Sequence, residues 1–248
     1  MTRSTFLHAV TMELRKARSL PAITWTLIIG MVATAALGVL AAFNTRDPGG
    51  DPTSNMLAGI LIGQLITGVL GALAITGEFD SGMAAVTFTA VPRRGVVLAA
   101  KALVWGVVFL VAGEVAVLAA FLGGTAVLRA SVPHPSLASP DVLRAVLMTG
   151  AYLALTGLFG LGVGALIRRG AASVATVVGG LFVAPLVIGL ADRSLGRLMP
   201  ELIAGNSLAA VKPVDGFAWS PWLELAIVAL YPAILLLAGG WQLRRRDA

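Results

Sequence analysis

The sequence predicts an all-α integral membrane protein, with six transmembrane helices preceded by an amphipathic helix in the membrane interface. Of the 248 residues, 58% are hydrophobic and only 12% are charged. That charged fraction is about half of the usual share in soluble proteins. Together with a mean hydropathy of +0.91, it excludes a water-soluble globular domain and a disordered chain. Six stretches also reach the length of about 20 apolar residues that a membrane-crossing helix needs: 21–43, 56–76, 97–122, 145–167, 171–191 and 221–241.

The distribution of basic residues predicts that both termini are cytoplasmic. Twelve lysines and arginines fall on the side of the N-terminal segment, the linkers after the second and fourth spans, and the C-terminal tail; six fall on the other side. Cytoplasmic loops carry the excess of such residues, and six spans independently require both termini on one side. We therefore expect a multi-pass protein of the plasma (cytoplasmic) membrane. Anionic lipid, and not nucleic acid, is the expected partner of these charges.

A single transmembrane domain is predicted over residues 1–248, and its first segment, 1–20, has the pattern of an interfacial helix. On a helical wheel of residues 4–18, one stripe is apolar and consists of Phe6, Leu7, Val10, Leu14 and Ala17. The opposite face carries His8, Thr11, Arg15 and Arg18, flanked by Glu13 and Lys16. This pattern is typical of a helix lying in the interface plane, although a frayed basic tail is an alternative. On the external side, segment 192–220 precedes the last span, and short surface helices are expected within 195–211.

The cytoplasmic segment 77–95 is longer than a simple connection between neighbouring helices requires. Acidic residues at its start, Glu78 and Asp80, favour the beginning of a helix. Pro92 is expected to end that helix, and Arg93 and Arg94 then lie at the membrane surface.

Three apolar side chains of this segment, those of Met83, Val86 and Phe88, are expected to face the cytoplasm. Burying one such side chain contributes roughly 1.5–3 kcal/mol. The segment is therefore predicted to dock a partner protein.

In this layout the chain resembles the type-2 ABC transporter permeases, the six-span membrane subunits of bacterial ABC exporters. The resemblance rests on the interfacial helix, the long external segment, the basic tail and, around the second cytoplasmic segment, Glu78, Gly82, Pro92, Arg93, Arg94 and Lys101. It implies that 82–91 forms a coupling helix docking on a separate ATPase subunit, with Glu78, Asp80, Arg93 and Arg94 at its ends. It also implies that 4–18 is a connecting helix beside that subunit. Two permease subunits, as a homodimer or a heterodimer, would bracket the substrate pathway.

The chain itself carries no pattern for nucleotide binding or catalysis. A P-loop needs Gly-Lys-Ser/Thr to hold phosphates, and none of the three lysines follows a glycine. ATP and Mg²⁺ are therefore expected on the partner subunit, with no cofactor or metal on this chain. The sequence has no cysteine, and its two histidines, His8 and His134, lie outside the predicted spans. The Gly-x-Ser pattern at Ser207 therefore has no histidine base within the membrane, and a non-catalytic subunit is predicted.

Two features within the spans leave alternatives open. Glu114 lies inside the third span, where a carboxylate is costly and functional by default. It is predicted either to contact a cationic substrate or gate, or to hydrogen-bond a neighbouring helix. Small residues at Gly59, Gly63, Thr67 and Gly71 allow close helix approach, within the chain or across a dimer.

The alternative function is an ATP-independent membrane protein, such as a secondary transporter or a membrane assembly factor. Secondary transporters usually carry broken helices or ionisable sites at mid-membrane, often in repeated halves. This sequence has one carboxylate well inside a span, Glu114, and no evident repeat.

Overall fold

The computed structural model describes residues 3–19, 21–46, 50–83, 94–191, 193–211 and 219–245, and within these ranges the chain forms helices and no strand. Six of these helices are long and apolar enough to span a membrane, which confirms the predicted fold class. They are α2 (Pro21–Asn44), α4 (Ile60–Asp80), α6 (Arg94–Val127), α7 (Pro140–Ile167), the helix Gly170–Ala191 and α12 (Pro221–Arg245).

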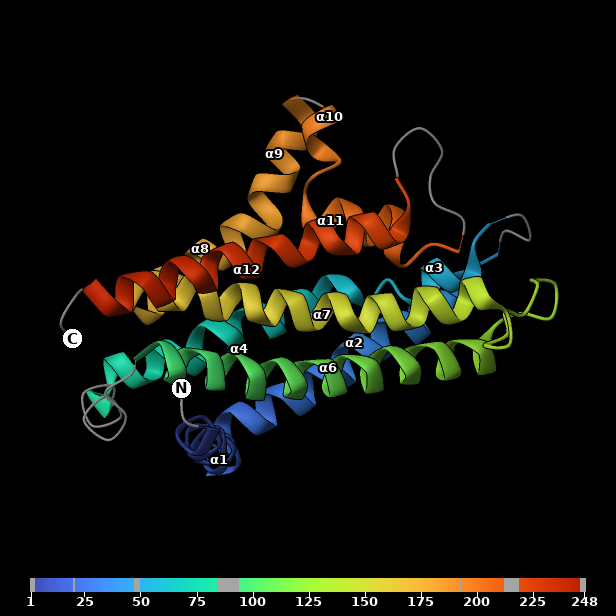
Figure 1. Cartoon of the computed structure of the whole chain (residues 1–248). Coiled ribbons are helices and arrows are strands. Elements are labelled where there is room, and N and C mark those ends of the chain that lie inside the picture. Colours follow the sequence, from blue (N-terminus) through green and yellow to red (C-terminus); the bar gives the residue numbers. More distant parts are fainter. Residues whose placement is uncertain are drawn as a thin grey trace.

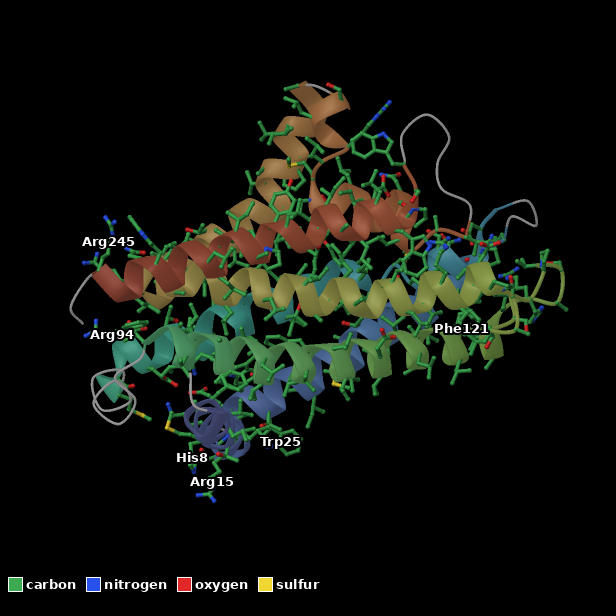
Figure 2. The ribbon with its side chains drawn as sticks, viewed as in Figure 1. His8, Arg15, Trp25, Arg94, Phe121 and Arg245 are labelled. Carbon is green, nitrogen blue, oxygen red and sulfur yellow. The ribbon has the colours of Figure 1, made fainter. Side chains whose placement is uncertain are left out.

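The bundle has two distinct ends. Helix α1 (Arg3–Ser19) lies crosswise to the long helices, at the end where α4 stops, α6 starts and α12 finishes (Figure 1). Arg15, Arg94 and Arg245 gather at this α1 end (Figure 2). The short helix α3 (Pro52–Met56), the end of α6 and the start of α7 lie at the opposite α3 end. Because α1 and the last turn of α12 share one end, the arrangement agrees with an even number of spans; that this end faces the cytoplasm stays a prediction.

Glycines bring α4 and α7 into close contact at the centre of the bundle. A Cβ atom at Gly71 would overlap the carbonyl of Gly157, and one at Gly160 would overlap the carbonyl of Gly68. Next to these pairs, the hydroxyls of Thr67 and Thr156 are 2.8 Å apart and hydrogen-bonded. The small residues of the second span therefore serve packing within the chain, one of the two alternatives that the sequence left open.

Helix α4 is longer than the sequence predicted. The second span was expected to end at 76, with Glu78 and Asp80 beginning a separate helix; that expectation was wrong, because both residues belong to the last turn of α4. Both carboxylates find partners on neighbouring elements, as described below, so the helix continues past its apolar stretch. It ends at Asp80, and Ser81 and then Gly82 follow; the φ of Gly82, +74°, lies in the left-handed region that glycine adopts without strain.

The fifth span leaves the bundle partway along its length. It consists of α8 (Gly170–Val178), a π-helical turn η1 (Gly179–Val183) and α9 (Ala184–Ala191). Figure 1 shows α9 diverging from α12, and Leu190 on it is 82% exposed. The π turn and Pro185 explain this change of direction, because both interrupt the regular backbone hydrogen bonds of the helix.

The segment after α9 then returns to the bundle through α10 (Arg193–Gly196), α11 (Pro200–Ile203) and a second π turn, η2 (Ala204–Leu208). Surface helices were expected here, but Ile203 and Leu208 are buried in the same apolar cluster as Tyr152 of α7. The segment therefore forms part of the core at the α3 end.

Candidate functional site

Four charged side chains form a compact cluster where α1, α4 and α6 meet. The Nζ atom of Lys101 on α6 lies 2.6 Å from Glu13 Oε2 on α1 and 2.7 Å from Glu78 Oε1 on α4. Lys16 Nζ on α1 lies 3.0 Å from the same oxygen of Glu78 and 3.4 Å from Glu13 Oε1. We refer to Glu13, Lys16, Glu78 and Lys101 as the ion-pair cluster.

Burial makes the inner pair of this cluster different from a surface salt bridge. The side chains of Glu13 and Lys101 are 0% and 2% exposed. Lys101 also donates to the carbonyl of Ala74 at 3.3 Å, so its three ammonium hydrogens have three acceptors. Buried charges are tolerated when they are paired and hydrogen-bonded in this way. The cluster therefore joins three helices through contacts that are costly to break.

The face of α1 toward the bundle includes a residue that the helical wheel placed beside the polar face. Glu13, expected beside the polar face, is the fully buried residue at the contact with α6, together with Ala9. Leu7 and Leu14 of the apolar stripe are instead 61% and 39% exposed. An apolar stripe turned outward beside a buried acid fits a helix that meets lipid with one face and the ion-pair cluster with another.

The last turn of α4, which carries Glu78, makes two further contacts next to the predicted coupling helix (82–91). Asp80 Oδ2 accepts a hydrogen bond of 3.3 Å from the amide of Gly170, at the start of α8. The Phe79 ring lies 5.5 Å from the Arg168 guanidinium, directly after α7. The base of the segment is therefore in contact with α1, α6, α7 and α8.

After the predicted coupling helix (82–91), Arg94 Nη1 donates to the carbonyl of Leu243 on α12 at 3.4 Å. Met83 is 49% exposed, as predicted. The remaining residues predicted to dock an ATPase, Val86, Phe88, Pro92 and Arg93, lie outside the described residues.

Glu114 is remote from this cluster. Its carboxyl group lies directly against Gly150 of α7, because a Cβ atom at Gly150 would overlap it. The side chain is half-buried at the contact between α6 and α7. Both predicted roles of Glu114 remain predictions.

A second buried polar group joins α4 to α7 within the span. Tyr152, fully buried, donates its hydroxyl hydrogen to Gln64 Oε1, and Gln64 is 1% exposed. Glu201 on α11 lies near enough for its charge to act on the Tyr152 hydroxyl. Burial raises the pKa of the Glu201 carboxyl above its ordinary value.

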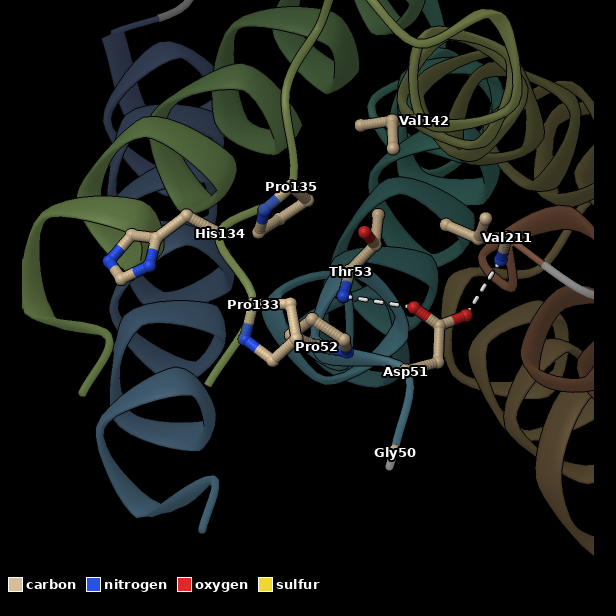
Figure 3. Close-up of a pocket in the computed structure, with 9 residues that line it drawn as sticks. All are labelled: Gly50, Asp51, Pro52, Thr53, Pro133, His134, Pro135, Val142 and Val211. Carbon is tan, nitrogen blue, oxygen red and sulfur yellow. Dashed lines mark hydrogen bonds between the residues drawn. The ribbon is translucent and has the colours of Figure 1, made fainter. Parts of the chain in front are cut away.

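At the α3 end, two charged side chains hold the backbone directly after η2. Asp51 Oδ1 caps α3 through the amides of Thr53 and Ser54, and its Oδ2 accepts a 2.7 Å hydrogen bond from the amide of Val211 (Figure 3). Arg144 Nη2 donates to the carbonyls of Ala210 and Val211 at 2.8 and 3.2 Å. A cavity of about 390 Å³ lies beside Asp51, with His134 and three prolines on its wall.

Sequence reasoning missed Glu13 and Lys101 as members of a site. A signal was present: Lys101 interrupts an apolar stretch, and a lysine at that depth requires a partner. Pairing residues 88 positions apart, however, required the crosswise placement of α1.

No group of three or more histidine, aspartate or glutamate side chains in the described part of the chain is arranged to hold a metal ion. Models of known protein families do not match the chain, and a search of curated proteins finds no relative with a significant match.

Proposed function

We propose that this protein is the transmembrane permease subunit of an ATP-driven ABC exporter in the plasma membrane. In this proposal two permease subunits form the substrate pathway, and separate ATPase subunits carry ATP and Mg²⁺. The ATPase docks on the segment between α4 and α6 and on the neighbouring face of α1. Residues of the segment assigned to docking are Gly82, Met83, Val86, Phe88, Pro92 and Arg93.

The ion-pair cluster is the observation that carries this proposal. A segment that transmits force from a docked partner must be attached firmly to the helices that it moves. Here Glu78, only a few residues before the segment, is held by Lys101 of α6 and Lys16 of α1. Asp80 contacts the start of α8, and Arg94 contacts the end of α12. A displacement of the segment is therefore passed to several helices at once.

These contacts revise the roles of two residues that the family resemblance placed at the ends of the docking surface. Glu78 and Asp80 face other helices of the chain, so we assign them to positioning the segment. Partner contact is assigned to the residues from Gly82 onward. In this proposal the docking segment starts from a firmly attached base, which suits transmission of an ATP-driven movement.

Co-purification tests the proposal. The chain would be purified in mild detergent after co-expression with the Walker-motif ATPase that the neighbouring reading frame is expected to encode. Stoichiometric capture and ATP hydrolysis are expected. Phe88→Asp should abolish capture without preventing membrane insertion, because an unpaired carboxylate in an apolar groove costs at least ~2 kcal/mol, more than a tenfold loss of affinity.

The matched control is Ser139→Asp, which adds the same charge at the α3 end, directly before α7. It should leave capture unchanged. Equal capture by Phe88→Asp and the wild type would place the docking site elsewhere. A wild-type chain that binds no ATPase would refute the exporter assignment and favour an ATP-independent membrane protein.

A further inference from the structure

A cavity of about 310 Å³ opens beside the ion-pair cluster, between α1, α2, α4 and α6. Its wall has two unlike parts. One part is charged or polar and consists of Glu13, Lys16, Ser19, Glu78, Ser81 and Lys101. The other part is apolar and includes Ile23, Leu73, Met83 and Trp105. A cavity divided in this way suits an amphipathic ligand.

The cavity lies at the level where a membrane changes from headgroups to acyl chains. Its charged wall comes from the crosswise helix α1 and from the ends of the spans. Close by, Leu7 on α1 and Trp25 on α2 are exposed, at 61% and 63%, and Trp25 projects away from the bundle (Figure 2). Exposed tryptophan and an outward apolar stripe are typical of the membrane interface.

The charges on the cavity wall favour a zwitterion. Two carboxylates and two ammonium groups give no net charge, so a purely anionic or cationic ligand meets repulsion as well as attraction. Lys16 and Glu78 are the accessible pair, with side chains 20% and 15% exposed. Both lysines contact Oε1 of Glu78, and Oε2 takes part in neither contact. A ligand with one phosphate and one N–H donor group can therefore match both signs of charge.

We propose that this cavity binds the headgroup of a zwitterionic phospholipid with a primary ammonium group, of the phosphatidylethanolamine type. The phosphate lies beside Lys16 and Ser81, and the ammonium lies beside Glu78. The acyl chains leave along the apolar wall at Ile23 and Leu73. A choline headgroup is disfavoured at the ammonium position, because it has no N–H to donate to a carboxylate. The assignment is independent of ATP-driven transport.

Gly77 offers a direct test, because it lines the cavity and a Cβ atom there would meet nothing within 4 Å. Gly77→Leu therefore fills the cavity without a clash against the backbone. Gly205→Leu is the matched control: its Cβ also meets open space, but it lies on η2, toward the other end of the bundle. Each full-length protein would be delipidated in detergent and measured by native mass spectrometry. Phosphatidylethanolamine, phosphatidylcholine and phosphatidylglycerol with identical acyl chains would be added in equal amounts.

The wild type and Gly205→Leu should retain phosphatidylethanolamine in preference to the other two lipids. Gly77→Leu should lose about tenfold in its retention, equivalent to 1.4 kcal/mol. Lys16→Met, which keeps the aliphatic stem, should reduce the preference for phosphatidylethanolamine over the other headgroups. This variant tests the lipid site if Gly77→Leu does not yield a monodisperse protein.

Equal retention of all three lipids would show non-specific annular lipid and overturn the proposal. A preference for phosphatidylglycerol would overturn the zwitterion assignment, and unchanged retention by Gly77→Leu would place the lipid elsewhere. Because no ATPase is present, failure here is distinct from failure of the exporter assignment.

Discussion

Replacing Lys101 with methionine tests whether the ion-pair cluster holds the α1 end of the bundle together. Methionine keeps the unbranched shape and most of the volume but removes the ammonium group. Glu13 and Glu78 then lose a cation at 2.6 and 2.7 Å. Removing one partner of a buried ion pair costs about 3–5 kcal/mol, because the remaining charge stays desolvated. An exposed pair contributes only about 0–1 kcal/mol.

Lys16 should moderate this loss. It stays within 3.4 Å of Glu13 and 3.0 Å of Glu78, but its side chain is partly exposed and its attraction is screened by water. We therefore expect Lys101→Met to destabilise the chain by about 3 kcal/mol, the lower end of the range. Adding Glu13→Gln removes the uncompensated buried charge, so the double mutant should be more stable than Lys101→Met alone. A double-mutant cycle then gives the coupling energy.

The assay is equilibrium unfolding in mixed detergent micelles, followed by tryptophan fluorescence. Arg15→Met is the matched control, because it also removes a cation from this end but its side chain is exposed on α1 and points away from the bundle (Figure 2). It should change stability by no more than about 0.5 kcal/mol. If Lys101→Met costs no more than this control, and Glu13→Gln gives no recovery, the cluster is not a structural joint and the argument for a rigid base fails.

Four further outcomes are expected. Gly160→Ala should destabilise the chain by about 1–3 kcal/mol, because its Cβ overlaps the Gly68 carbonyl. The control Gly179→Ala, whose Cβ meets nothing within 4 Å, should not destabilise it. Equal unfolding midpoints for the two variants would contradict the close α4–α7 contact. Burial raises the pKa of the Glu201 carboxyl. The contribution of this carboxyl to stability is therefore full below the ordinary carboxyl pKa and declines as pH rises through the raised value. Glu201→Gln should therefore match the wild type in acid and melt at a higher temperature near neutral pH, whereas a pH-independent difference would argue against this titration. If Glu114 contacts a cationic substrate, Glu114→Gln should lower its transport while leaving the ATPase rate of the complex intact; unaffected transport would favour the structural role. Among single cysteines at Ser4, Ser139 and Ala248, only that at 139 should be labelled from outside, and labelling at 248 would refute the predicted orientation.

The spans were predictable because the membrane requirement acts locally. About 20 apolar residues identify a crossing helix whatever it packs against, and all six predicted stretches correspond to spanning helices. Their ends were less predictable. Helix α4 continues through Glu78 and Asp80, and α6 begins at Arg94, ahead of the apolar stretch. Hydropathy ended the second span before Glu78, whereas the folded chain continues that helix because the charge has a partner.

The candidate site adjoins the segment that the sequence indicated, but the residues that form the site were only partly predicted. The segment after the second span was identified from its length and exposed apolar residues, and Met83 is exposed as expected. The helical wheel placed Glu13 beside the polar face of α1, because a wheel sorts residues by polarity and takes no account of partners on other helices. The partner that makes its burial tolerable, Lys101, lies on another helix.

The two ends of the bundle are closed by contacts of different strength, and this difference bears on how the helices can move. At the α3 end, Asp51 and Arg144 hold the backbone of Ala210 and Val211 through charge-assisted hydrogen bonds, each contributing about 1.5–3 kcal/mol. When they separate, water can replace them, because both side chains are only partly buried. At the α1 end, separating Glu13 from Lys101 leaves charges that are almost fully buried. We therefore expect the bases of α1, α4 and α6 to move as one unit, with any rearrangement of the helices concentrated at the α3 end.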